Sequence, residues 1–179
     1  MEKKKGLYGL IAEFDTPTEV VNAAHKAYDA GYRKMDAYTP FPIEELNEAM
    51  HLKRSKVPLI VLIGGIVGGV GGYLLQYWAS NIAYPMNIGG RPMHTWPMFI
   101  VITFECTILV AAFSAVLGML ALNGLPQPYH PVFNSPRFEL ASRTNFFLCI
   151  EADDPNFDEH RTREFLEGLS PGKVSDVEP

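Results

Sequence analysis

The sequence predicts a membrane α-helical hairpin of two transmembrane helices, inserted in a cytoplasmic α+β domain of the ferredoxin-like split type that both tails build together. Residues 57–90 carry no charged side chain, and residues 92–136 carry only Glu105. Each stretch holds the roughly 20 apolar residues that a helix needs to cross about 30 Å of hydrocarbon. Each tail shows a strand, helix, strand pattern, and one such unit is too small to bury a core.

The N-terminal tail, residues 1–56, is expected to form the first half of the α+β domain. Residues 6–14 are rich in aliphatic and aromatic side chains, which predicts a strand. Thr16, Pro17 and Glu19 match an N-cap, a first helical proline and a capping box. The remaining elements predicted here are the end of this helix at Gly31, a strand over residues 32–38 and a short helix over residues 44–52.

The hairpin is predicted over residues 57–122, with an outward-facing loop over residues 81–96. Basic side chains precede the first span within residues 51–56, whereas the loop holds only Arg91. By the positive-inside rule, both termini are therefore expected in the cytoplasm. An aromatic belt at the outer interface is expected from Tyr73, Tyr77, Trp78, Tyr84 and Trp96.

The C-terminal tail is expected to complete the α+β domain. Residues 123–136 are rich in proline, which predicts a semi-rigid connector rather than a helix. Residues 137–179 are predicted to contain a strand over residues 145–152, a helix over residues 157–169 that starts from Asp153-Asp154-Pro155, and a short strand over residues 173–177. The alternative is two independent amphipathic tails that lie on partner proteins.

Cysteine, histidine and charge content restrict the chemistry of this chain. Cys106 and Cys149 are the two cysteines, so the chain cannot build a disulfide framework or an iron-sulfur site, and Cys-x-x-Cys-His is absent. His94 and His130 flank the second span on opposite sides, where they cannot pair on one haem. Residues 137–179 hold five basic against ten acidic side chains, which argues against nucleic acid as a partner. Redox cofactors, metal ions included, are therefore expected in partner chains.

Glycine recurs at four-residue spacing in the first span, so one face of that helix is nearly bare backbone. Such a face permits close helix contact in membranes. The residues predicted to pack are Gly64, Gly65, Gly68, Gly69 and Gly72 in the first span, and Ala111, Ala115 and Gly118 in the second, where Ala112 and Ser114 are also small. A phosphate-binding loop is excluded because no Gly-Lys-Ser/Thr ends the run.

Glu105 is the sharpest chemical feature of the spans, because an acid in lipid costs roughly 2.5 to 3.5 kcal/mol unless a partner relieves it. One interpretation is a proton-relay carboxylate. The other is a protonated acid that is hydrogen-bonded across a helix interface. Both interpretations need neighbouring subunits, because two helices cannot surround the group.

Several local patterns, in their order and spacing, together resemble one family, the D subunit of alternative complex III. They span residues 6–154 and comprise Tyr38-Thr39-Pro40-Phe41-Pro42, the glycine-laced span, Tyr84-Pro85, Gly89-Gly90-Arg91-Pro92, Trp96-Pro97, Phe104-Glu105, Leu125-Pro126 and His130-Pro131. The resemblance implies a cofactor-free, non-catalytic membrane subunit of a quinol:electron-acceptor oxidoreductase in the bacterial inner membrane, within a respiratory or photosynthetic chain. It also implies that c-type haems and iron-sulfur clusters belong to partner subunits.

A second hypothesis is a small homo-oligomeric membrane transporter or channel. In that case Glu105 from several copies would line a pore. The large cytoplasmic domain exceeds what such a pore requires.

Overall fold

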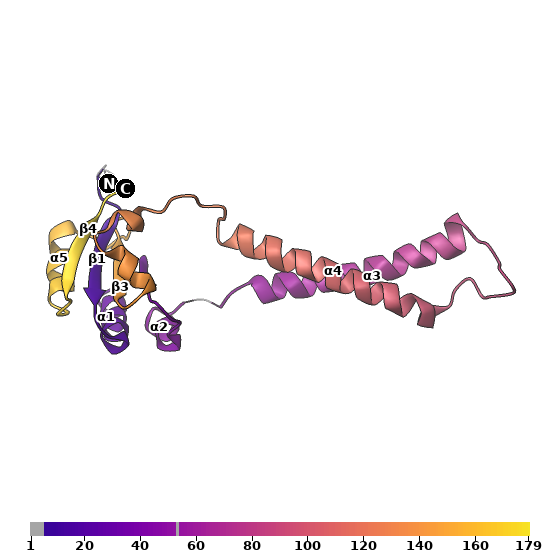
Figure 1. Cartoon of the computed structure of the whole chain (residues 1–179), viewed down its shortest axis with the longest axis horizontal. Helices are drawn as coiled ribbons and strands as arrows, with labels where there is room; N and C mark the ends of the chain where they lie inside the picture. Colours follow the sequence, from indigo (N-terminus) through magenta and orange to yellow (C-terminus); the bar gives the residue numbers. More distant parts are fainter. Residues whose placement is uncertain (1–5, 53) are drawn as a thin grey trace. The chain divides into compact units, whose positions relative to one another are not determined.

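The computed structural model describes residues 6–52 and 54–179 as two units (Figure 1). One unit contains the described residues of 1–53 together with Pro128–Pro179, and the other is Arg54–Gln127. Residues 1–5 of the predicted N-terminal half and Lys53 of the predicted basic flank lie outside the described residues.

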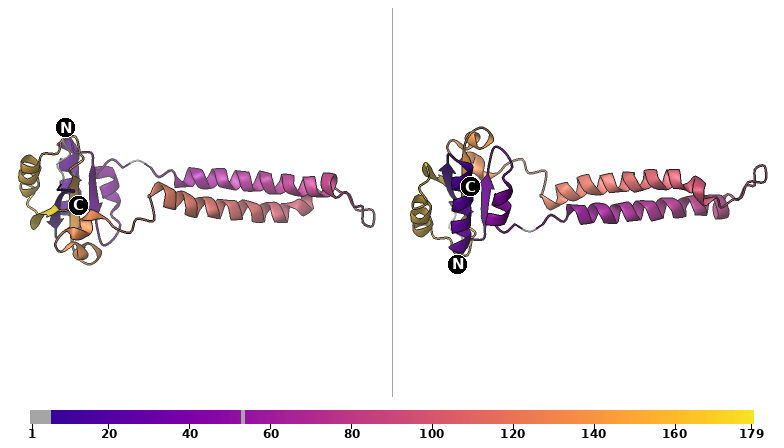
Figure 2. Two further views of the ribbon diagram at one scale, coloured as in Figure 1. Left: turned by 90° about the horizontal axis from the view of Figure 1, so that it is seen from above. Right: turned by 90° about the horizontal axis from the view of Figure 1, so that it is seen from below.

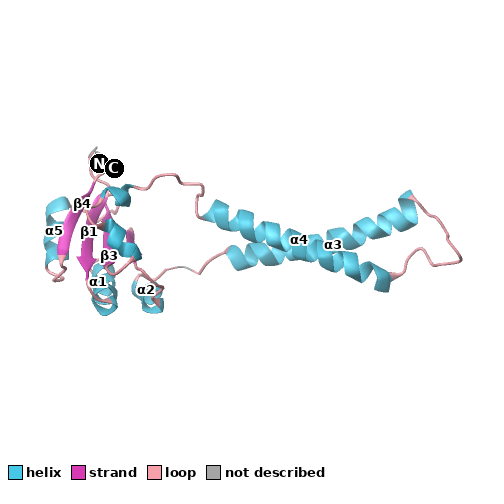
Figure 3. Ribbon diagram, in the orientation of Figure 1, coloured by secondary structure: helices cyan, strands magenta, loops and turns pink. Residues whose placement is uncertain are grey.

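The first unit contains a four-stranded antiparallel sheet (Figure 3). Its strands are β1 (Gly9–Phe14), β2 (Met35–Tyr38), β3 (Phe146–Glu151) and β4 (Lys173–Val177), in the order β2-β3-β1-β4. Strands from the two tails therefore alternate across the sheet. This pairing contradicts the alternative of two independent tails.

Helix α1 (Pro17–Asp29) begins with the predicted capping box. The Glu19 N–H donates to Thr16 Oγ1 at 3.3 Å, and the Thr16 N–H donates to Glu19 Oε2 at 3.2 Å. The two bonds satisfy N–H groups that the helix itself leaves unpaired. Gly31, just after the helix, has a φ of +96°, a conformation that a glycine adopts without strain.

The two faces of the sheet carry different coverings. One face packs Leu10 and Leu148 against α1, α2 (Glu44–Ala49) and α5 (Glu159–Glu167). The other face packs Ile11, Phe147 and Cys149 against the 3-10 helices η2 (Pro131–Asn134) and η3 (Phe138–Ser142). The alternation of side chains along β1 and β3 thus buries both faces.

Several predicted boundaries differ from the structure. β2 starts at Met35 rather than at residue 32, α2 ends at Ala49 rather than at residue 52, and a 3-10 turn occupies part of the predicted connector. Helix α5 starts at Glu159, with Asp158 as its N-cap, so the predicted start at Asp153-Asp154-Pro155 was wrong. The physical reason is that Asp154 is buried and accepts the N–H groups of Arg33, Lys34 and Asn156, at 2.6, 2.7 and 2.8 Å.

The second unit is a helical hairpin. Helix α3 (Val57–Trp78) continues into one π turn, η1 (Ala79–Ala83), and α4 (Trp96–Leu122) returns beside it, as both views of Figure 2 show. The α4 helix begins at Trp96, the last residue of the predicted loop. By length and composition, both helices are able to cross a membrane, with mean hydropathies of 2.0 and 2.3 over their most apolar windows.

Candidate functional site

The glycine face of α3 lies against α4. Gly64, Gly68 and Gly72 are buried in the hairpin. A Cβ atom at Gly68 would lie 2.5 Å from the Cys106 carbonyl oxygen, and one at Gly72 would lie 2.7 Å from the Cys106 Cβ. The two backbones approach so closely at these positions that no larger residue fits without a shift of the helices.

The remaining small residues that the sequence singled out lie at different places in the hairpin. Gly65 faces the Ala111 Cβ, Gly69 faces the Thr107 hydroxyl group, and Gly118 lies against the Ile60 side chain. Ala115 is half-buried, whereas Ala112 is exposed on the far side of α4. The glycines also have Cys106, Thr107 and Val110 of α4 as neighbours, and the small-residue pattern did not predict this role for Thr107 and Val110.

Gln76 adds a polar contact to this apolar interface. Its Nε2 group donates to the carbonyl oxygens of Gly72 and Phe99 and to Thr103 Oγ1, each at 3.1 Å. Gln76 extends the four-residue series that begins at Gly64, so its position in the interface was detectable from spacing alone. Inside a helix pair, such bonds fix one relative rotation and register of the two helices.

A histidine lies among aromatic rings where α3 and α4 meet the loop. The Tyr73 hydroxyl and His94 Nε2 are 2.8 Å apart. The rings of Tyr77 and Phe99 also lie within 6 Å of the His94 ring, at centroid distances of 5.3 and 5.8 Å. The cluster ties the last residues of the loop to α3.

Glu105 lies on the side of α4 that faces away from α3. Thr103, Cys106 and Thr107 are half-buried at the helix pair, whereas Glu105 is exposed and Phe104 beside it is 62% exposed. No residue that the structure describes forms a hydrogen bond or ion pair with the Glu105 carboxyl group. The geometry leaves this group available only to molecules outside the hairpin.

In the sheet unit, three polar side chains form a chain of hydrogen bonds. The Val132 N–H donates to His130 Nδ1 at 3.4 Å, which places the imidazole proton on Nε2. His130 Nε2 lies 3.3 Å from the Tyr8 hydroxyl, which donates to Glu151 Oε1 at 3.3 Å. Burial, followed by the Glu151 carboxylate, raises the pKa of Tyr8 well above its ordinary value. Tyr8 therefore keeps its proton and remains a donor.

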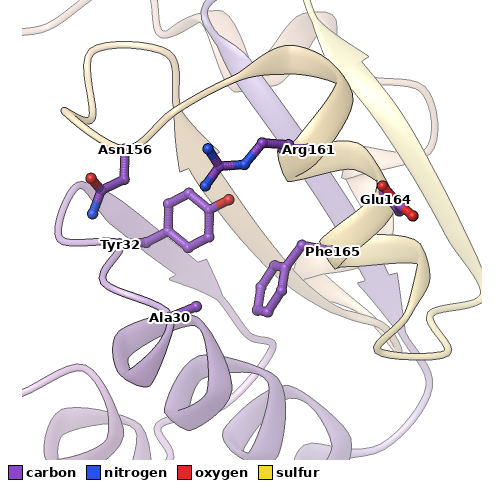
Figure 4. Close-up of a pocket in the computed structure, with 6 residues that line it drawn as sticks. All are labelled: Ala30, Tyr32, Asn156, Arg161, Glu164 and Phe165. Atoms are coloured by element: carbon purple, nitrogen blue, oxygen red, sulfur yellow. The ribbon is translucent and has the colours of Figure 1, made fainter.

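A cavity of about 320 Å³ lies between the end of α1 and α5 (Figure 4). Its lining residues are Ala30, Tyr32, Asn156, Arg161, Glu164 and Phe165. The Tyr32 hydroxyl is bonded to Thr162 at 3.0 Å, and the Asn156 amide donates to the Gly31 carbonyl oxygen at 2.8 Å. Both of these polar groups already bind protein atoms.

Histidine, cysteine, aspartate and glutamate are the usual side chains that bind metal ions in proteins. Within residues 6–52 and 54–179, no three histidine, cysteine, aspartate or glutamate side chains converge as metal ligands would. Cys106 packs against the glycine face, and Cys149 is fully buried in the sheet.

The model of the family described as alternative complex III, ActD subunit, matches residues 8–176. The chain belongs to the ActD family. This confirms the resemblance seen in the sequence, and it extends the match through α5 and most of β4. No curated protein matches the chain. As an ActD subunit, the chain is part of an oxidoreductase complex, so other subunits of that complex are its partners.

Proposed function

We propose that this ActD chain is a non-catalytic integral membrane subunit of alternative complex III, a quinol-oxidising electron-transfer complex. The family match over residues 8–176 carries this proposal. The c-type haems and iron-sulfur clusters of the complex would reside in companion subunits. This chain would supply a hairpin that packs in the membrane and a domain that braces the assembly.

The proposed orientation places both termini and the α+β domain in the cytoplasm of a bacterium, with the hairpin across the inner membrane. Arg54 and Lys56 precede α3, whereas Arg91 is the one charged residue of the loop between the helices. Basic residues favour the cytoplasmic side. Trp78, Tyr84 and Trp96, at the opposite end, are 52%, 72% and 61% exposed, as residues of an outer interface would be.

The proposed domain type is ferredoxin-like. The order β2-β3-β1-β4, with every neighbouring pair antiparallel and helices α1 and α5 in the two halves, supports this assignment. The hairpin is inserted between the halves, at the connection from β2 to β3. This arrangement supports a bracing role for the domain, because its sheet forms only when strands of both tails pair with one another.

Glu105 is proposed as a proton-conducting carboxylate within the assembled complex. Its exposure on the outer side of α4 supports a role that involves a neighbouring subunit. The test replaces Glu105 with glutamine, which keeps size and polarity but cannot release a proton. Proton-coupled turnover of the purified complex should fall while its subunit content stays constant. Unchanged turnover would contradict the proposed proton relay.

The membership of the complex is tested by purification of the tagged chain from native membranes in mild detergent. Haem-bearing companions should accompany it, detected by their absorbance and by mass spectrometry of the intact assembly. A lone 20.0 kDa species would overturn the proposal. A pure homo-oligomer would instead favour the transporter or channel.

A further inference from the structure

We infer that the outer face of α4 around Glu105 docks a membrane-spanning helix of a companion subunit, and that this helix donates a hydrogen bond to the Glu105 carboxyl group. The inference rests on the proposed function, because it requires companions in the same membrane. It names the contact that this chain would make with them.

The outer face of α4 is defined here as Val101, Glu105, Leu109, Ala112 and Val116. These residues recur at intervals of three and four, so they lie on one side of the helix. Val101, Leu109 and Val116 are 62%, 56% and 53% exposed, and Ala112 is exposed as well. The opposite side of α4 meets the glycine face of α3 through Cys106 and Val110. The contacts between α3 and α4 therefore do not use the outer face.

Glu105 cannot be satisfied within the hairpin. It lies nine residues after Trp96, about 14 Å along the helix, which is too deep for easy access to water. Arg91 is the only basic residue between α3 and α4, and its guanidinium group contacts the Met98 sulfur instead. A carboxyl group in hydrocarbon without a partner is costly, whether it is ionised or protonated. A donor from another helix removes that cost.

The shape of the face also fits a helix. Ala112 lies two turns from Glu105 and almost directly in line with it, since seven residues of an α-helix rotate by nearly two full turns. Its small side chain permits close backbone approach beside the acid, as small residues do in membrane helix pairs. Lipid tails would cover the apolar side chains but would leave the carboxyl group unpaired. A second copy, packed symmetrically, would bring a second carboxyl group, which donates to the first only while one of the two acids is protonated.

Photo-crosslinking in the intact complex tests the occupant directly. A photoreactive amino acid at Ala112 should join this chain to a companion subunit, which mass spectrometry identifies. Products with a second copy of this chain, or with lipid alone, would overturn the inference. The wild-type chain must co-purify with haem-bearing companions in the same preparation. Failure of that co-purification would count against the proposed function, whereas failure of the crosslink alone counts only against this docking face.

Substitution of Glu105 tests the hydrogen bond. Glu105→Leu should weaken retention in the detergent-extracted complex by about threefold to tenfold, the range found for one polar contact between membrane helices. Glu105→Gln should retain binding if the donor is neutral and lose it if the donor is cationic. Phe113→Leu, at a 60% exposed position of α4 outside this face, is the matched control and should behave as wild type. Full retention of Glu105→Leu would overturn the inference.

Discussion

Tyr8 and His130 are 122 residues apart in the sequence, yet the Tyr8 hydroxyl lies 3.3 Å from His130 Nε2. Their rings also meet edge to face, with centroids 5.3 Å apart. Tyr8 directly precedes β1, and His130 caps the 3-10 turn η2. The pair therefore fastens the segment before η2 to the sheet, with Glu151 on β3 as the third member.

Tyr8→Phe should loosen this segment while it leaves the sheet intact. The substitution removes the hydroxyl that bridges His130 and Glu151 but keeps the ring packing. We expect a loss of about 1 kcal/mol in the free energy of unfolding. Hydrogen exchange at the Val132 amide should become faster. Tyr84→Phe, at an exposed ring of the hairpin unit, is the control, and equal exchange in both variants would contradict the prediction.

Gly68→Leu should separate the two helices of the hairpin. Its Cβ atom would lie 2.5 Å from the backbone oxygen of Cys106, which cannot move without a shift of α4. Overpacking of this kind costs about 1 to 3 kcal/mol. The measurement is the thermal stability of the detergent-solubilised chain and the yield of its folded form. Gly71→Leu is the matched control, because nothing lies within 4 Å of a Cβ at Gly71. Equal effects at both glycines would show that bulk, and not contact, is responsible.

Asp154→Ala should destabilise the sheet unit strongly. The substitution leaves the N–H groups of Arg33, Lys34 and Asn156 without their acceptor. Hydrogen bonds to a charged group are worth about 1.5 to 3 kcal/mol each, so we expect a loss of about 3 kcal/mol or more. Asp153→Ala, at the exposed neighbouring position, should cost little. Urea unfolding of both variants, monitored by far-ultraviolet circular dichroism, gives the two free energies of unfolding. Equal losses in Asp154→Ala and Asp153→Ala would contradict the prediction.

The stability of the sheet unit should fall in alkaline solution partly because of Cys149. Burial, with the nearby Glu151 and Asp36 carboxylates, raises the pKa of the Cys149 thiol to about 12, from 9.0 for a free thiol. Between these values the unfolded chain loses a proton that the folded chain keeps. The contribution is therefore complete below pH 9 and is lost as the pH rises toward 12.

The check is the pH dependence of the free energy of unfolding under reducing conditions. From pH 9 to pH 11, wild type should lose more stability than Cys149→Ala, and the difference between them should shrink as the pH rises. In the folded wild type, thiol reagents should not label Cys149 at pH 8. Parallel curves for the two proteins, or rapid labelling, would contradict the prediction.

Local signals were sufficient for most elements of the fold. The capping box at Thr16, the charge-free stretches and the four-residue glycine repeat each depend on interactions within a few residues of sequence. The start of α5 was misplaced because Asp154 also matches a local helix-start signal. Its real partners, Arg33 and Lys34, are about 120 residues earlier, so no local pattern reveals them.

The order of residues already shows that two apolar helices are long enough to cross a bilayer, that one of them has a bare glycine face, and that a single acid lies in the other. These properties follow from composition and helical period, which are local. Three features became apparent only in the folded chain: Cys106 lies against Gly68 and Gly72, the strands of the two tails alternate in one sheet, and Glu105 points away from α3. These features depend on which helix faces pack together and on which distant segments pair. Such contacts join residues that are far apart in the sequence, so no local pattern reveals them.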